Sequence, residues 1–225
     1  MKMNLVSSEV LTCVFKIQSC TNVGTGFILE HKGNNFLITA KHLFEEEGFP
    51  KSADIDIEYE NGMMKIENKI FYHDDNSVDV AVIKTNFFEG QSFSKVNYTS
   101  DDMILSQDVF LLGFPYGFDN KLYDLNNGHP IPIVKKGIIS GFDDDIILID
   151  WDNNQGFSGG PVIYRRIEGL GYSDEVNIAG VIVSYISHAI YEDKDKNVIS
   201  ENSGIGIAVK INKVLEIIDN IDIGI

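Results

Sequence analysis

From residue 10 onward, the chain consists of short apolar, β-branched and aromatic runs, each bounded by Gly, Asn, Asp or Pro. Runs of this length between turn residues are typical of β-strands rather than helices. They predict strands at 10–20, 24–31, 35–41, 53–60, 64–73 and 78–85 and, after a polar stretch at 86–106, at 107–115, 133–142, 145–151, 160–166, 176–187 and 203–211. The pattern therefore predicts an all-β fold of two six-stranded units, each a barrel or a sandwich.

The C-terminal segment INKVLEIIDNI departs from this pattern. Its apolar residues recur with the period of an amphipathic helix. They are Val214, Leu215, Ile217, Ile218 and Ile221. A short helix is predicted at 212–221.

The charge balance argues against two classes of partner. Asp and Glu number 34 against 18 Lys and Arg, which gives a formal net charge of −16. A surface this acidic repels phosphate backbones and anionic lipids, so we expect no nucleic-acid partner and no membrane partner. No apolar stretch is long enough for a signal peptide or a membrane span, and the expected location is therefore the cytoplasm.

Cysteine and histidine spacing gives no sign of a metal site. Cys13 and Cys20 form neither a CxxC pair nor a disulfide framework, and we expect both as reduced thiols. The chain has no HExxH motif and no paired Cys/His spacing. We expect no metal and no organic cofactor.

The segment GFSGGP at 156–161 is the strongest chemical signal in the sequence. Glycines around Ser158 allow backbone conformations closed to other residues and let backbone amides approach a ligand. Ser158 is therefore a candidate nucleophile, but a serine hydroxyl needs a base to take its proton and a third group to orient that base.

One histidine and one aspartate fit these two roles. His42 ends the buried-type run FLITAKH, and Asp79 heads the apolar run VDVAVI, where a buried charge is costly without a partner. A histidine N–H would supply that partner. The remaining histidines lie in polar, turn-like contexts and are interpreted as ordinary surface residues: His31, His73, His129 and His188.

The blocks LITAKH, SVDVAVIK and GFSGGP resemble the His, Asp and Ser blocks of chymotrypsin-fold serine proteases, in the same order. The segments GFPYG, KGIIS and GIAV are similar to those of HtrA/Deg-like proteases. The resemblance covers about residues 10 to 220 and is to a protease domain without a PDZ domain. It implies one trypsin-like protease domain over 1–225, built from two six-stranded antiparallel β-barrels. The N-terminal barrel at 10–90 would carry His and Asp, the C-terminal barrel at 105–211 would carry Ser, and the helix at 212–221 would follow.

The resemblance also implies a role for each matching residue. Ser158 would be the nucleophile, His42 the general base and Asp79 the group that fixes the His42 tautomer. The backbone N–H groups of Gly156 and Ser158 would form the oxyanion hole. The expected activity is that of a serine endopeptidase acting on protein or peptide substrates through an acyl-enzyme intermediate.

Substrate specificity is less determined by the sequence. Asp152 stands where trypsin-type enzymes keep the carboxylate that selects Arg or Lys, but the same stretch is equally similar to the HtrA/Deg loop, whose pocket takes small aliphatic side chains. Both P1 preferences remain open. Ser184 and Tyr185 resemble the strand edge that pairs with the substrate backbone, and they are the other expected substrate-binding residues.

The chain departs from these relatives at Phe157, where digestive enzymes place an Asp that binds a buried N-terminal amine. Something else must then hold the oxyanion hole, and one expectation is a protease that stays latent until a protein partner or ligand orders the loop around Ser158. Lys41, beside His42, would either point away or lower the basicity of His42. The alternative function is a catalytically silent module that binds peptides or partners. An esterase with a GxSxG elbow is disfavoured, because only His188 follows Ser158 and too few residues lie between them.

Overall fold

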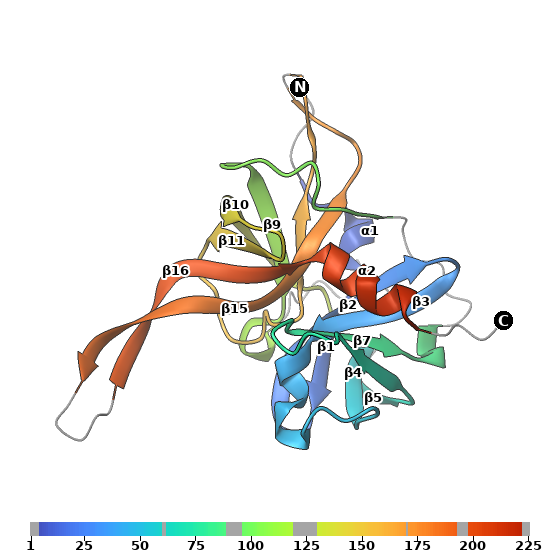
Figure 1. The fold of residues 1–225 in the computed structure, drawn as a ribbon. Coiled ribbons are helices and arrows are strands. Elements are labelled where there is room, and N and C mark those ends of the chain that lie inside the picture. The colour runs from blue at the N-terminus through green and yellow to red at the C-terminus, as the bar shows by residue number, and fades with distance from the viewer. Residues whose placement is uncertain are drawn as a thin grey trace.

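The computed structural model describes residues 5–59, 62–88, 96–118, 130–169, 171–192 and 198–221. Strands dominate, as predicted, and they form two large sheets packed against each other (Figure 1). The helical elements are α1 (Ser8–Leu11), η1 (Lys41–Glu47), η2 (Asn86–Phe88), η3 (Pro115–Gly117) and α2 (Ile211–Asp219).

The first sheet has seven strands in the order β5-β4-β1-β2-β3-β7-β6 and forms a half-barrel. Its strands are β1 (Val14–Ser19), β2 (Asn22–His31), β3 (Asn34–Ala40), β4 (Ile55–Tyr59), β5 (Gly62–Ile66), β6 (Lys69–Tyr72) and β7 (Val80–Lys84). The strand predicted at 64–73 is two strands in the structure. The break falls at Asn68, whose side-chain amide donates to the backbone carbonyls of Ala53 and Ile66 and so turns the chain out of the ladder.

The second sheet closes into a barrel. Its order is β12-β9-β10-β11-β16-β15-β8, and an additional β12–β15 pairing joins the ends into six strands around a core, with β8 outside the ring. The strands are β8 (Asn97–Tyr98), β9 (Asp108–Gly113), β10 (Ile133–Phe142), β11 (Ile146–Asp150), β12 (Pro161–Tyr164), β15 (Asn177–Glu192) and β16 (Val198–Lys210). A small separate hairpin is formed by β13 (Ile167–Glu168) and β14 (Gly171–Tyr172). The predicted chymotrypsin-like double-barrel class is confirmed.

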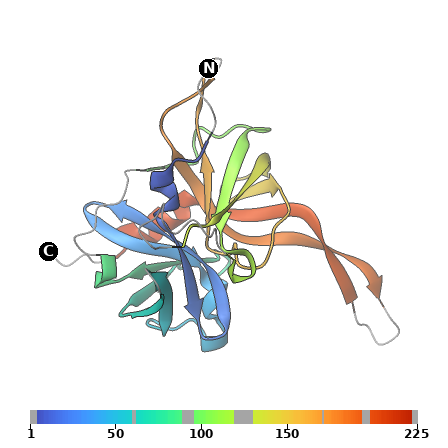
Figure 2. The ribbon, with the colours of Figure 1, turned by 180° about the vertical axis from the view of Figure 1, so that it is seen from behind.

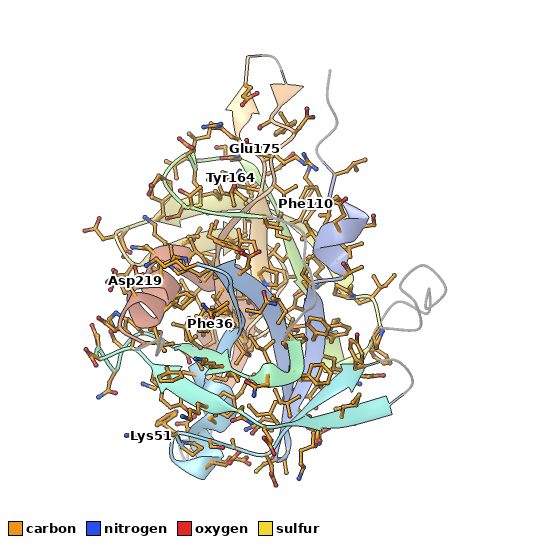
Figure 3. The ribbon with its side chains drawn as sticks, turned by 90° about the vertical axis from the view of Figure 1, so that its right-hand side faces the viewer. Phe36, Lys51, Phe110, Tyr164, Glu175 and Asp219 are labelled. Atoms are coloured by element: carbon orange, nitrogen blue, oxygen red, sulfur yellow. The ribbon has the colours of Figure 1, made fainter. Side chains whose placement is uncertain are left out.

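One continuous core joins the first sheet, the facing side of the second barrel and α2. A second cluster fills the second barrel and includes Trp151, Phe157 and Tyr164. Phe36 of the first sheet and Tyr164 of the second lie inside the molecule (Figure 3). Burial of both sheet faces explains why strands such as β3 read as unbroken apolar runs rather than alternating ones.

The predicted C-terminal helix is present as α2, Ile211–Asp219. It buries the apolar face that the sequence pattern indicated, through Ile211, Val214, Ile217 and Ile218. The helix lies against β7 and β15 and so fastens the end of the chain across both sheets.

Strands β15 and β16 extend beyond the barrel as a long two-stranded arm (Figures 1 and 2). The sequence predicted shorter strands here, at 176–187 and 203–211. The pairing continues outward from Tyr185–Gly206 to Glu192–Val198, with register shifts along β15. Past Ile182, the described strands pair with β15 on the β16 side alone.

In the described part of the chain, no helix has both the length and the apolar character needed to cross a membrane. Neither Cys13 nor Cys20 forms a disulfide; Cys13 is buried and Cys20 is exposed. His129 lies outside the described residues.

Candidate active site

His42 and Asp79 are brought together by two neighbouring antiparallel strands. β3 ends at Ala40, opposite Val80 at the start of β7, so His42 and Asp79 leave the same edge of the first sheet. His42 Nδ1 lies 2.7 Å from Asp79 Oδ2, and the His42 backbone N–H donates to Asp79 Oδ1 at 2.8 Å. Because an ionised carboxylate only accepts hydrogen bonds, Nδ1 carries a proton, and in the neutral imidazole Nε2 is then the acceptor.

The ammonium group of Lys41 points away from His42 and Asp79. The Lys41 side chain is buried, and its Nζ donates to the backbone carbonyl of Asn76 at 3.1 Å. The same Nζ lies 4.9 Å from the centre of the Phe49 ring. Of the two orientations that the sequence left open, the structure has the one directed away from His42.

The loop around Ser158 requires glycine at two positions. Gly156 has φ +103°, and a Cβ there would lie 2.3 Å from the Phe114 carbonyl oxygen. Gly159 has φ +86°, and its Cβ would lie 2.1 Å from the Thr25 carbonyl oxygen. Side chains at these positions would therefore be strained and would clash with backbone.

Thr25 of β2 links the first sheet to this loop, and the sequence analysis missed it. Its buried hydroxyl donates to the Gly156 carbonyl at 2.7 Å and accepts from the Phe114 N–H at 3.1 Å. Its backbone N–H donates to the Ser158 carbonyl at 2.8 Å. The available signal was the run Gly24-Thr25-Gly26, because glycine inside a strand often marks a close approach of another backbone.

The Gln155–Gly156 peptide is oriented by a neighbouring turn. The Gln155 carbonyl accepts a hydrogen bond from the Tyr116 N–H at 2.8 Å. In a trans peptide the N–H points opposite to the carbonyl, so the Gly156 N–H faces away from Tyr116. Within the described residues, no acceptor bonds to the N–H of Gly156 or of Ser158. Two free amides beside a serine form a site suited to a negatively charged oxygen.

A cleft of about 550 Å³ joins these parts. His42 and Ser158 both line it, as do the three expected substrate-binding residues Asp152, Ser184 and Tyr185. Tyr116, Asn153, Asn154, Gln155, Val183 and Asn202 complete the lining. Asp79 lies behind His42 and does not line the cleft.

The surroundings of Asp152 were not predicted. The Asp152 side chain is 80% exposed, and Lys135 Nζ of β10 lies 3.6 Å from its Oδ2. Lys135 is remote in sequence and no motif marked it. Among the described residues, no group of three or more His, Cys, Asp or Glu side chains is placed to hold a metal ion.

The sequence matches the family described as trypsin-like peptidase domain over residues 24–170, a range that contains His42, Asp79 and Ser158. Protease Do-like 5, chloroplastic, from Arabidopsis thaliana is 29% identical over 163 residues, which are 69% of this chain and 47% of that protein. The chain thus spans about half the length of this curated relative.

Solved structures show the same fold at lower identity. The active form of the Rv3671c protease from M. tuberculosis aligns with a TM-score of 0.58 at 20% identity, over 94% of this chain and 82% of that chain. An HtrA-type protease solved with a tripeptide aligns with a TM-score of 0.62 at 18% identity, over 96% of this chain and 62% of that chain. With the family match covering more than half of its length, the chain belongs to the trypsin-like peptidase domain family.

Proposed function

We propose that the protein is a serine endopeptidase that uses Ser158, His42 and Asp79 to hydrolyse peptide bonds in protein or peptide substrates. The observation that carries the proposal is the 2.7 Å contact between His42 Nδ1 and Asp79 Oδ2, beside a cleft that His42 and Ser158 line together. Family membership supports protease chemistry at these positions.

The proposed first step is attack by Ser158. His42 Nε2 takes the proton from Ser158 Oγ while Oγ forms a bond to the scissile carbonyl carbon and the carbonyl π electrons move to its oxygen. Asp79 holds the Nδ1–H tautomer and stabilises the imidazolium that results. The new oxyanion accepts hydrogen bonds from the free N–H groups of Gly156 and Ser158.

The remaining steps regenerate the enzyme. The tetrahedral intermediate collapses, the C–N bond breaks and His42 gives its proton to the leaving amine, which leaves an ester on Ser158. Water, deprotonated by His42, then attacks this ester to form a second oxyanion; the bond between the acyl carbon and Ser158 Oγ breaks, and His42 returns its proton to Oγ. The N–H groups of Gly156 and Ser158 donate to no acceptor among the described residues, and the Gln155 carbonyl is held by the Tyr116 N–H. Both observations favour an oxyanion hole that forms without an activating protein partner.

Substrate binding is proposed at the edge of β15 that pairs with no described strand past Ile182, where the Ser184 carbonyl accepts a hydrogen bond from the Asn153 side chain at 3.1 Å. Ser184 and Tyr185 line the cleft, and an extended substrate would add to this edge as an antiparallel strand. Such pairing binds backbone groups and selects extended rather than folded segments. The cytoplasmic location stays a proposal, supported by the reduced thiols of Cys13 and Cys20.

The decisive experiment is labelling of the native protein with a fluorophosphonate probe, with the adduct site read by mass spectrometry. Wild type should form an adduct at Ser158, and Ser158→Ala should form none. Ser140→Ala removes an exposed serine of β10 and is the matched control, which should label like wild type. Folded wild-type protein without an adduct would favour the silent binding module, or a latent enzyme that awaits its partner.

A further inference from the structure

Lys135 is the cation that reaches into the loop carrying the active-site amides. It lies on β10, and its Nζ donates to the Asp152 backbone carbonyl and to Asn154 Oδ1, both at 2.5 Å. The side chain is 27% exposed. A lysine with these partners is anchored rather than free in solvent.

The same ammonium also contacts two aromatic rings of the loop. Lys135 Nζ lies 5.6 Å from the ring centre of Trp151 and 5.7 Å from that of Phe157. The two rings are edge-to-face, with centres 5.0 Å apart, and both side chains are buried. Cations within about 6 Å of an aromatic face are attracted to it. Lys135 therefore contacts both ends of the segment 151–157.

These contacts connect directly to the oxyanion hole. The Phe157 N–H donates to the Asn154 carbonyl at 3.2 Å, so the residue held by Lys135 also fixes the turn around Gly156. Phe157 cannot form an ion pair; its ring is held by burial and by packing against Trp151, and the Lys135 ammonium adds an electrostatic contact to this packing. Lys135 supplies a positive charge from within the chain at the place where the loop must be ordered.

Lys135 also forms an ion pair with the carboxylate of Asp152. Its carboxylate is the negative group at the expected P1 pocket, and Lys135 Nζ is 3.6 Å from Oδ2. An Arg or Lys side chain of a substrate would compete with this resident cation. The pairing therefore weakens selection for a basic P1 residue.

We propose that Lys135 is a positioning residue whose ammonium holds segment 151–158 in the form that keeps the Gly156 and Ser158 amides free, and that it turns the cleft away from basic P1 residues. The proposal rests on the proposed function for its catalytic consequence. The ordering of the loop can be measured without it.

The test compares Lys135→Met, which removes the charge at similar volume, with Lys135→Arg, which keeps it. Lys136→Met is the matched control, because Lys136 is the next residue of β10 and is paired instead with Asp108 at 3.0 Å. For each variant, kcat and KM are measured on peptide amides that differ at P1, alanine against arginine. Lys135→Met should lower kcat by about 100- to 1,000-fold, the loss that follows removal of one oxyanion-hole donor. Lys135→Arg and Lys136→Met should stay near wild type.

The preference between arginine and alanine at P1 is a second readout, and it would not change if Lys135 only stabilised the fold. In Lys135→Met, the ratio of kcat/KM for arginine over alanine at P1 should rise by about fivefold, the upper end of what an exposed ion pair supplies. An unchanged ratio and an unchanged kcat would overturn the proposal. An equal fall of kcat in Lys136→Met would overturn it as well.

The single tryptophan reports on the loop independently of catalysis. Trp151 is the only tryptophan of the chain, so acrylamide quenching of its fluorescence measures exposure of this segment in folded protein. Quenching should rise in Lys135→Met and stay at the wild-type value in Lys136→Met. If wild type does not hydrolyse peptides, the proposed function fails while this measurement still decides the ordering role. Unchanged quenching in folded Lys135→Met refutes that role.

Discussion

The hydroxyl of Thr25 is a contact between the two sheets whose energetic effect can be worked out. The side chain is fully buried and holds the Gly156 carbonyl and the Phe114 N–H. Thr25→Val keeps the shape of the side chain but leaves both groups without partners. Two orphaned buried groups at about 1–3 kcal/mol each should lower the free energy of unfolding by about 2–6 kcal/mol. For a chain of this length the melting temperature should fall by about 2–4 °C per kcal/mol, hence by at least about 4 °C.

Urea denaturation and thermal unfolding measure this loss. Thr25→Ser is the control, because it keeps the hydroxyl and removes a methyl group, at an expected cost of about 1 kcal/mol. The urea midpoint should move with little change in the m-value, since the folded state stays intact. If Thr25→Val matched wild type, or if the Val and Ser variants lost equal stability, the hydrogen bonds of Thr25 would not hold the two sheets together as argued.

Three further changes test the site and the core. Asp79→Asn should lower kcat by about 10⁴-fold, the loss known for this change in serine-protease triads, because the wrong His42 tautomer is favoured. Steady-state kinetics at neutral pH measure this loss, and a kcat near the wild-type value would contradict the prediction. Gly156→Ala should both destabilise the protein and abolish fluorophosphonate labelling, since φ is +103° and the new Cβ meets the Phe114 carbonyl; normal labelling would contradict the described loop. Burial raises the pKa of Tyr164 from 10.0 to about 12, so its contribution to stability is present below pH 10 and is lost as the pH rises toward 12. Urea midpoints between pH 9 and 12 should therefore fall less steeply in Tyr164→Phe, and parallel curves would contradict this.

Much of the fold could be predicted because strands and turns leave local traces. The apolar runs that became β3 and β7 are continuous since both faces are buried, and the period of α2 matches the face it buries. The details that differ depend on contacts made elsewhere. Asn68 splits a predicted strand only because the Ala53 carbonyl lies beside it, and β8 exists as a strand only through its pairing with β15.

The candidate site divides in the same way. His42, Asp79 and Ser158 were recognisable because each lies in a short block with its own composition. The groups that hold those blocks in place could not be identified with their partners: the glycines beside Thr25 indicate only a close approach of some backbone, and no motif marks Lys135. Thr25 acts on Gly156 across 131 residues of sequence, and Lys135 acts on Asn154 from a different strand.

The sequence by itself determined the strand pattern, the terminal helix and the residues able to carry acyl-transfer chemistry. These follow from periodicity, turn residues and side-chain type, which are local properties. Only the tertiary structure decided where Lys41 points, which cation meets Asp152, how far the β15–β16 arm extends and which backbone amides stay free. Each of these depends on distances between segments far apart in the chain, and such distances are fixed only when the sheets close and pack.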